Sequence, residues 1–466
     1  MENAQEWAER EFGEVSLGDK RRTQRAVKMA SQMACEPLGS LPKQMKSWEA
    51  QKGAYRLLDN GKVSHPQLSE PHWRHTRETA GQAGSVILMV QDFTDLNYTH
   101  HPATQGLGPI SSQAFLSGLW VHNTLAIQPQ ERRVLGLVYQ QVWAREAQTY
   151  KGRESKTTRR KRSNRQSLRW GQAVTAIGKP PEGVKWVYVA DREADLFEFF
   201  ENTLKIGADF CIRLVQERRL ADWTVEQPLY LLKTMREVPE MGQRTLNIPA
   251  SPGQAARQAH LAVSWQNVTL RSPRNIPGED KYLTAWVVRT WEQKPPADVD
   301  PIEWLLITSV SVQSLPDALE RIDWYTCRWI IEEYHRCLKT GCQIEKSQLR
   351  HAERIQRLLA FLSILAVRLL QLRDLSRATP HLLAIDHVDP ILVQIIALRV
   401  NKEPNDLSLG SFWIETAKLG GFPARKSDGD PGWLRLWRGW LQLLDIAEGV
   451  RLASNLPPID KDVGNP

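Results

Sequence analysis

Two short, uninterrupted apolar runs, each followed by an aspartate, constrain the fold of this chain most. Residues 86–90 read VILMV and lead to Gln91 and Asp92, and residues 186–190 read WVYVA and lead to Asp191. A continuous apolar run of this length predicts a strand buried on both faces. Further strand-like runs lie at 120–127, 133–143, 210–215 and 304–308, and helix-like segments at 166–177 and 194–204. We expect an α/β core with some parallel pairing, in which the first three strands form an antiparallel meander.

The two aspartates are candidate metal ligands. We expect Asp92 and Asp191 at the C-terminal ends of their strands, the edge at which open α/β sheets form their sites. Carboxylates there suit Mg²⁺, which takes oxygen ligands at about 2.0–2.1 Å and keeps water and phosphate oxygens in its shell. Two such ions about 3.5–4 Å apart can activate a nucleophile and stabilise the leaving oxygen of a phosphodiester. A third carboxylate should come from elsewhere in the chain.

A long helix, expected from residue 316 to about residue 338, supplies that carboxylate. Four of its residues are spaced 3, 4 and 7 apart: Tyr325, Arg328, Glu332 and Lys339. This spacing predicts one shared helical face, on which Glu332 could bind metal while Arg328 and Lys339 hold neighbouring phosphates. Taken singly, a strand-end aspartate is more often a turn or cap residue, and such a face is more often a ladder of surface ion pairs. Their joint occurrence favours a site.

The positive charge of the chain is concentrated in one segment. The net charge of the chain is +8. Residues 151–170 carry nine Lys or Arg and one acid, Glu154, so the net charge of this stretch equals that of the whole chain. Such density suits a polyphosphate partner, although a solvated loop is a compatible alternative. No apolar run reaches the roughly 20 residues of a membrane helix, and residues 1–12 lack a secretory signal. Five scattered cysteines without paired spacing suit a reducing, cytoplasmic setting.

Three segments flank or interrupt the expected core of residues 67–375. Residues 1–66 read as helical, with Ser16 and Asp19 as plausible N-caps and Arg21, Arg25 and Lys28 on one face, which could also be an ordinary exposed basic face. Residues from 216 to about 303 read as a mostly β insertion. Residues 376–466 read as a helical tail that carries an apolar stripe. The stripe, which either packs inside its own domain or forms a dimer seam, consists of Trp433, Trp437, Trp440 and Leu444.

These motifs resemble the cut-and-paste bacterial insertion-sequence transposases that carry a Tyr-(2)-Arg-(3)-Glu-(6)-Lys signature. The helix matches that signature at every position. The run Asp191-Arg-Glu-Ala-Asp195 is similar to the family's second-aspartate motif, and Gln91-Asp92-Phe-Thr94 to its first. Shorter similarities run nearly end to end, from 17–23 and 53–56 through 120–122 to 366–373 and 419–422.

The resemblance implies an RNase H-like catalytic core with a β insertion, a helical N-terminal DNA-binding domain and a helical C-terminal dimerisation domain. It implies a DDE triad of Asp92, Asp191 and Glu332 that binds two Mg²⁺, for which Mn²⁺ can substitute. It further implies DNA hairpin chemistry with a flipped base, a homodimer on transposon-end and target DNA, and a bacterial cytoplasmic setting at the nucleoid without membrane attachment. The DNA contacts that it implies are Trp304 as the base-stacking aromatic, Tyr325, Arg328, Lys339, Arg192, Arg22 and Arg25.

Two features depart from the family pattern. Phe93 stands where the family usually has Thr, and the segment 151–169 is more basic than the family leads us to expect. Two other functions remain open: a DNA-binding relative without transposition activity, and a different RNase H-like nuclease such as a resolvase. An intact triad argues against the first, and the signature helix with its tail argues against the second.

Overall fold

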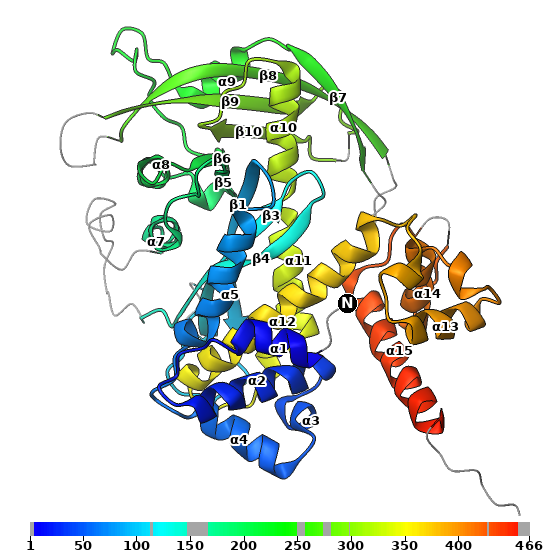
Figure 1. Ribbon diagram of the computed structural model, residues 1–466. Coiled ribbons are helices and arrows are strands. Elements are labelled where there is room, and N and C mark those ends of the chain that lie inside the picture. The colour runs from blue at the N-terminus through cyan, green and yellow to red at the C-terminus, as the bar shows by residue number, and fades with distance from the viewer. Residues whose placement is uncertain are drawn as a thin grey trace, which may run out of the picture. The chain divides into compact units, whose positions relative to one another are not determined.

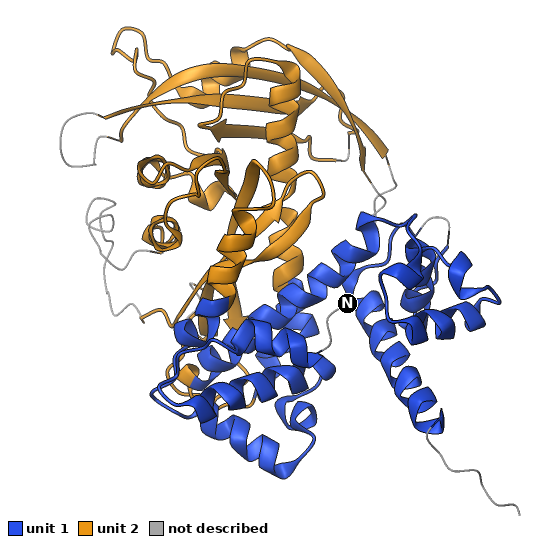
Figure 2. Ribbon diagram, in the orientation of Figure 1, with its two compact units in different colours: residues 1–71, 336–347, 354–466 blue, residues 72–335, 348–353 orange. Residues whose placement is uncertain are grey.

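The computed structural model describes residues 4–111, 115–146, 166–248, 257–273, 281–297, 299–425 and 428–454. The chain forms two compact units, shown in different colours in Figure 2. Unit 1 consists of residues 1–71, 336–347 and 354–466, and unit 2 of residues 72–335 and 348–353. The strongly basic residues 151–165 lie outside the described residues.

Unit 2 is built on a ten-stranded mixed sheet among its described residues (Figure 1). The order is β2-β3-β1-β5-β6-β10-β9-β8-β7, with β4 paired to β3. The strands are β1 Val86–Asn97, β2 Gly108–Pro109, β3 Ser117–Gln128, β4 Arg133–Trp143, β5 Lys185–Ala190, β6 Asp209–Arg213, β7 Gly242–Ile248, β8 Arg257–Arg271, β9 Tyr282–Glu292 and β10 Glu303–Thr308.

The central five strands have RNase H-like topology. β1, β3 and β4 form the expected antiparallel meander, and β5 and β6 then add in parallel to β1, giving the order β4-β3-β1-β5-β6. The predicted fold class, an α/β RNase H-like core with a β insertion, is therefore confirmed. Parallel pairing of β5 with β1 requires a crossover, and the chain supplies it through α7, Leu168–Ile177.

The two faces of this sheet are covered by different helices. Alternate residues of each strand point to opposite faces. Ile87 and Met89 pack in one apolar core with aromatic residues of α7 and of α8, Phe197–Lys205. On the opposite face, the Cys211 thiol of β6 donates to the Arg321 carbonyl of α10, Leu315–Thr326. Asp92 lies two residues after Val90 and four after Leu88, so its side chain projects to the same second face as theirs.

The β insertion continues the catalytic sheet. β9 pairs with β10, and β8 pairs with β9 and β7 on its two sides. The insertion also holds one short helix, α9, Leu231–Glu237. Because β10 pairs with β6 as well as with β9, a single backbone hydrogen-bond ladder joins the insertion to the core.

Unit 1 consists of helices in its described residues. They are α1 Ala4–Phe12, α2 Lys20–Cys35, α3 Leu41–Met45, α4 Trp48–Leu58, α12 Ala352–Ala378, α13 Pro390–Arg399, α14 Leu409–Leu419 and α15 Trp433–Ser454, while α5, His65–Ala80, begins in unit 1 and ends in unit 2. Asp19 caps α2, accepting the Arg21 backbone N–H at 2.9 Å, as expected. By length and composition alone α12 could cross a membrane, but 83% of its most apolar window is buried within the protein.

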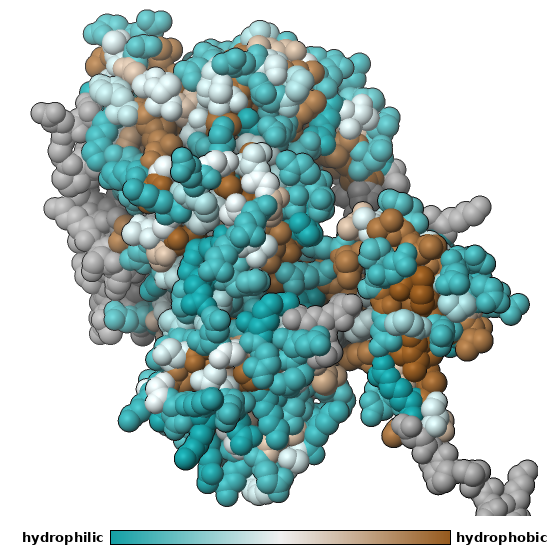
Figure 3. All heavy atoms as spheres, viewed as in Figure 1, coloured by the Kyte–Doolittle hydropathy of each residue, from teal (hydrophilic) through white to brown (hydrophobic). Residues whose placement is uncertain are grey.

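The tryptophan stripe of α15 is packed inside its own unit. Trp433, Trp437 and Trp440 are buried, and the rings of Trp413 on α14 and Trp440 lie 5.3 Å apart. A dimer seam formed by these tryptophans is therefore the wrong interpretation, since all three are already buried within the unit, Trp433 against Gly341 and Trp440 against Trp413. Leu444, the fourth residue of the stripe, is exposed. Figure 3 shows apolar surface over the region of α13 to α15. The exposed apolar side chains of these helices include Leu398 and Leu452.

Candidate catalytic site

Asp92 lies within β1 rather than at its end. The strand continues to Asn97, and Asp92 pairs with Asn123 of β3. The prediction that Asp92 ends its strand is wrong because pairing with β3 continues after the apolar run stops. On the other side of β1, pairing with β5 ends at Val90–Val189. Asp92 thus lies just beyond the last parallel pair, where the sheet opens.

Asp191 follows β5 directly, as predicted. Its backbone is extended, and its Oδ1 accepts the Glu193 backbone N–H at 2.9 Å, capping the short 3-10 turn Arg192–Ala194. The cap fixes the carboxylate at the carboxyl end of the strand next to β1, so the sheet brings the two aspartates together.

The carboxylates influence one another electrostatically. Burial, followed by the charge of Asp191, raises the pKa of Asp92 to about 7, and Glu332 adds to the rise. The Arg328 guanidinium and the Phe93 backbone N–H, which Asp92 accepts at 2.8 Å, act in the opposite direction. Burial and Asp191 also raise the pKa of Glu193. Perturbation of this kind is typical of functional sites.

Glu332 lies on a separate short helix and not on one long helix. α10 ends at Thr326, residues 327–328 form a turn, and α11 spans Trp329–Arg336. Around the turn, backbone N–H groups bond three residues back, as from Arg328 to the Tyr325 carbonyl at 3.0 Å. The prediction of a continuous helix from 316 to 338 is therefore wrong.

Arg328 joins Asp92 and Glu332. Its guanidinium lies 3.5 Å from Asp92 Oδ2 and 2.8 Å from Glu332 Oε1. The side chain is largely buried, and its guanidinium carbon lies 4.8 Å from the centroid of the Trp329 ring. A buried cation between two acids offsets part of their mutual repulsion.

The donor set fits a hard divalent cation. Asp92, Asp191 and Glu332 offer carboxylate oxygens, the ligands that Mg²⁺ prefers, and the raised pKa of Asp92 shows that its negative charge is undercompensated. Within the described parts of the chain, no group of three or more potential ligands is already gathered around one point. Glu332 instead pairs with Arg328 through its Oε1 atom.

Trp304 and Tyr325 lie together near Arg328. Trp304 is half-buried at the start of β10, and its ring meets that of Tyr325 edge-on at 5.2 Å. Tyr325 is buried, which raises its pKa, and Arg328 and Arg213 act against that rise. Arg213 of β6, which also donates to the Glu303 carbonyl at 3.3 Å, is a cation here that sequence reasoning missed. Only the pairing of β6 with β10 reveals it.

Asp195, the second aspartate of the 191–195 run, was also missed. It is fully buried, forms an ion pair with Arg218, and accepts the backbone N–H groups of Val215 and Gln216 at 2.8 and 2.7 Å. These contacts hold the turn after Asp191 against the residues that follow β6. The repeated aspartate was the available signal, but sequence alone does not tell a buried aspartate from an exposed one.

The remaining predicted DNA contacts are dispersed. Arg192 is exposed beside Asp191. Lys339 lies in a π-helical turn, Cys337–Gly341, with its Nζ 3.8 Å from Glu345 Oε1. In α2, Arg22 donates to the Leu17 carbonyl at 2.7 Å. Arg25 lies across α4 at Gly53, where a Cβ would be 2.5 Å from the guanidinium carbon.

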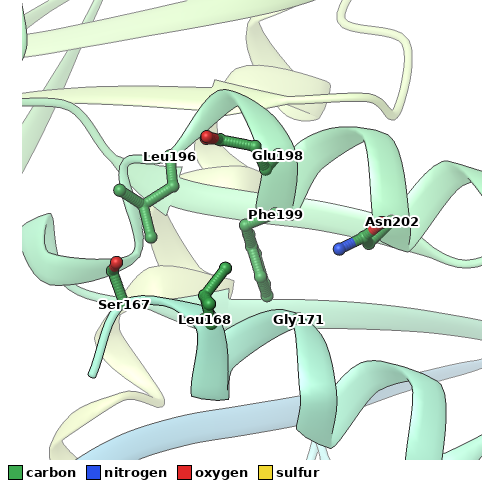
Figure 4. A pocket seen from close by; sticks show the side chains of 7 residues that line it. All are labelled: Ser167, Leu168, Gly171, Leu196, Glu198, Phe199 and Asn202. Carbon is green, nitrogen blue, oxygen red and sulfur yellow. The ribbon is translucent and has the colours of Figure 1, made fainter. Parts of the chain in front are cut away.

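A pocket between α7 and α8 lies on the other face of the sheet from Asp92 and is not part of this site. Its cavity volume of about 30 Å³ gives room for only a few water molecules. Figure 4 shows its lining, with the ring of Phe199 between the two helices.

Two family descriptions and several solved structures match this chain. Residues 4–63 match the family described as transposase DNA-binding, and residues 146–368 match the family described as transposase DDE domain. The second match contains Asp191 and Glu332, and Asp92 precedes it. Among solved structures, a piggyBac transposase synaptic complex with hairpin DNA is similar at 9% identity and a TM-score of 0.38, covering 95% of this chain and 85% of that chain.

Proposed function

Because this chain is a DDE transposase, an enzyme that binds DNA and uses divalent metal ions to cleave it and transfer strands, we propose that it carries out cut-and-paste transposition. The Tyr325, Arg328, Glu332 and Lys339 spacing supports placing it among the insertion-sequence transposases that carry this signature. Within that group, we propose the transposase of the kanamycin-resistance composite transposon as the most similar protein. The observation that carries the proposal is geometric: Asp92 and Asp191 come from adjacent strands of the sheet, and Asp92 and Glu332 share the guanidinium of Arg328.

We propose that Asp92, Asp191 and Glu332 hold two Mg²⁺, with Mn²⁺ as a substitute. Ions in such a pair lower the pKa of an attacking hydroxyl and stabilise the leaving oxygen. Asp92 and Asp191 offer ligands from adjacent strands, and Glu332 closes the site from α11. With Glu332 and Asp92 bound to metal, the guanidinium of Arg328 would be free to bind a DNA phosphate.

The aromatic pair and its cations suit a distorted DNA end. Trp304 presents a half-buried ring above Tyr325, and an extruded base can stack on such a ring for about 1–3 kcal/mol. Tyr325, Arg328 and Lys339 would hold phosphates of the hairpin. Arg192 would contact DNA beside Asp191, and Arg22 and Arg25 would contact the transposon end through α2.

We propose a homodimer on transposon-end and target DNA, in the bacterial cytoplasm at the nucleoid. The exposed apolar side chains of α13 and α15, including Leu398, Val450 and Leu452, support a protein contact in the tail. The proposed domains are 1–66 for DNA binding, 67–375 for catalysis and 376–466 for dimerisation.

Cleavage of DNA that carries the element's terminal repeat tests the proposal. With Mg²⁺, the wild type should give hairpin-ended product, Asp191→Ala should give none, and Glu333→Gln, an acid neighbouring Glu332, should still cleave. End binding without cleavage by the wild type would instead favour a domesticated or inhibitory DNA-binding relative. Cleavage without a hairpin would favour another RNase H-like nuclease.

A further inference from the structure

Three polar residues lie in one row across neighbouring strands. Asp92 on β1 pairs with Asn123 on β3, and Asn123 pairs with Gln140 on β4. Register partners project to the same face of a sheet, here the face opposite the α7–α8 core. Asn123 and Gln140 are both buried. The row thus extends from a proposed metal ligand into the interior of the sheet.

Two consecutive residues of α11 meet this row. The Nδ2 of Asn123 lies 2.9 Å from Nε2 of His335, and Nε2 of Gln140 donates to Oδ1 of Asn123 at 2.6 Å and to the Tyr334 hydroxyl at 3.4 Å. Tyr334 and His335 are buried as well. His335 lies three residues after Glu332, which is about one helical turn.

The donors and acceptors of this group determine its orientation. Because Gln140 donates to the carbonyl oxygen of Asn123, the amide nitrogen of Asn123 is left to donate to His335. Nε2 of His335 is then the acceptor, which places the ring proton on Nδ1. In this arrangement both polar atoms of the Asn123 amide have a matching partner.

α11 needs an external support of this kind. The helix has eight residues, follows a break at 327–328 and runs into a π-helical turn. A regular long helix would fix Glu332 by its own hydrogen bonds, but a short helix between two irregular turns takes its position from packing. A displacement of about 1 Å can cost a metal-dependent enzyme roughly 100-fold in rate.

We propose that Asn123, Gln140, Tyr334 and His335 are positioning residues that set the placement of Glu332 against Asp92. The inference rests on the proposed triad, which it deepens. These residues act through the triad, because their polar atoms are engaged with one another inside the protein. A general-base role for His335 is disfavoured for the same reason.

Variants that keep the volume but remove the hydrogen bonds test the proposal. Asn123→Leu and His335→Leu should lower the rate of strand cleavage at saturating Mn²⁺ by about 10–100-fold, the usual range for residues that orient metal ligands. They should also raise the dissociation constant of Mn²⁺, measured by calorimetry on the DNA-bound protein, several-fold. Affinity for the DNA end should change less than about twofold. His335→Gln, which restores an acceptor near the Nε2 position, should recover most of both losses.

His72→Leu is the matched control for a merely structural role. His72 is buried in the same unit, and its Nε2 accepts the backbone N–H of Leu137 on β4 at 3.1 Å. It should lower the melting temperature as much as His335→Leu does, yet leave Mn²⁺ affinity and cleavage by the folded protein unchanged. Equal Mn²⁺ affinity in His335→Leu and wild type, or equal losses in both histidine variants, would overturn the proposal.

Failure of the triad itself gives a different pattern. If Glu332→Gln still cleaves and binds Mn²⁺, the proposed site is wrong. If Glu332→Gln is inactive while Asn123→Leu and His335→Leu behave as wild type, the site stands and only the positioning role is lost.

Discussion

Helix α11 and the turn before it meet the sheet through two chemically different contacts, about one helical turn apart. At the first, which we call the charged side, Glu332 and Arg328 lie with Asp92, whose pKa is raised to about 7 by burial and by neighbouring carboxylates. At the second, which we call the neutral side, Tyr334 and His335 meet neutral amides, and the donors match the acceptors. The same eight-residue helix therefore carries an electrostatically unfavourable site and a stable polar junction.

The difference indicates where stability is lost and where it is gained. Carboxylates gathered without full compensation destabilise the folded protein, and they are retained where a ligand relieves the repulsion. A matched buried hydrogen-bond group stabilises one arrangement of the chain. The charged side is thus expected to respond to metal and pH, and the neutral side to changes of shape.

The largest effect is expected on the charged side. Glu332→Gln keeps the size of the side chain but removes a charged ligand, so cleavage should fall by roughly 10³-fold or more, since a two-metal site depends on each ligand. Binding of the DNA end, measured by gel shift, should change little. Loss of binding together with cleavage would contradict a pure ligand role for Glu332.

A fully compensated acid in the same motif as Asp191 sharpens the comparison. Arg218→Met leaves the buried Asp195 carboxylate without its cation, and breaking such a pair costs about 3–5 kcal/mol. Chemical denaturation should show this loss at neutral pH. Lys281→Met, which breaks a more exposed pair with Glu201, should cost less than about 1 kcal/mol. Similar losses in both variants would mean that burial does not determine how much the Asp195–Arg218 pair contributes to the free energy of unfolding.

The unfavourable charge on Asp92 predicts a stability gain on neutralisation. Its folded pKa lies above its unfolded value of 3.8, so the stability from its protonated form is complete below about pH 4 and is lost as the pH rises through about 7. In metal-free buffer at pH 8, the free energy of unfolding of Asp92→Asn should therefore be about 2–4 kcal/mol higher than that of the wild type. The difference should shrink toward pH 4. A constant difference across that range would refute the raised pKa.

The smallest effect concerns the aromatic pair next to the charged side. Trp304→Ala removes a stacking surface worth about 1–3 kcal/mol per base, so hairpin formation should slow by about 10-fold while initial nicking is nearly unchanged. Single-turnover assays on nicked and intact ends separate the two steps. Trp291→Ala, a change on the neighbouring strand β9, serves as the control. Equal slowing of nicking and hairpin formation would count against stacking.

Residue spacing located the three candidate acids better than it located the residues that support them. The apolar runs before Asp92 and Asp191 predicted two strands that pair with each other in the sheet, and the signature spacing singled out Glu332, which shares the Arg328 guanidinium with Asp92. The break at 327–328 was not predicted, since the residues around it are weak helix formers but include neither Gly nor Pro, and only the folded chain shows their short-range hydrogen bonds.

The polar junction was hidden for a different reason. Asn123 and Gln140 are distant in sequence from His335 and become neighbours only through the register of β1, β3 and β4. Strand register depends on the packing of whole faces, which a local pattern does not contain. The burial of Trp433, Trp437 and Trp440 likewise depends on α14, so the stripe alone left two interpretations open.

Strand β10 limits how such a chain can change in length during evolution. It is paired on both sides, with β6 and with β9, so inserting one residue within it would turn every later side chain to the opposite face. The connection at 293–302 lies outside the ladder, and longer loops cost little free energy. Insertions and deletions are therefore expected to accumulate in that connection, while Trp304 and the strand that bears it are inherited together with the catalytic sheet.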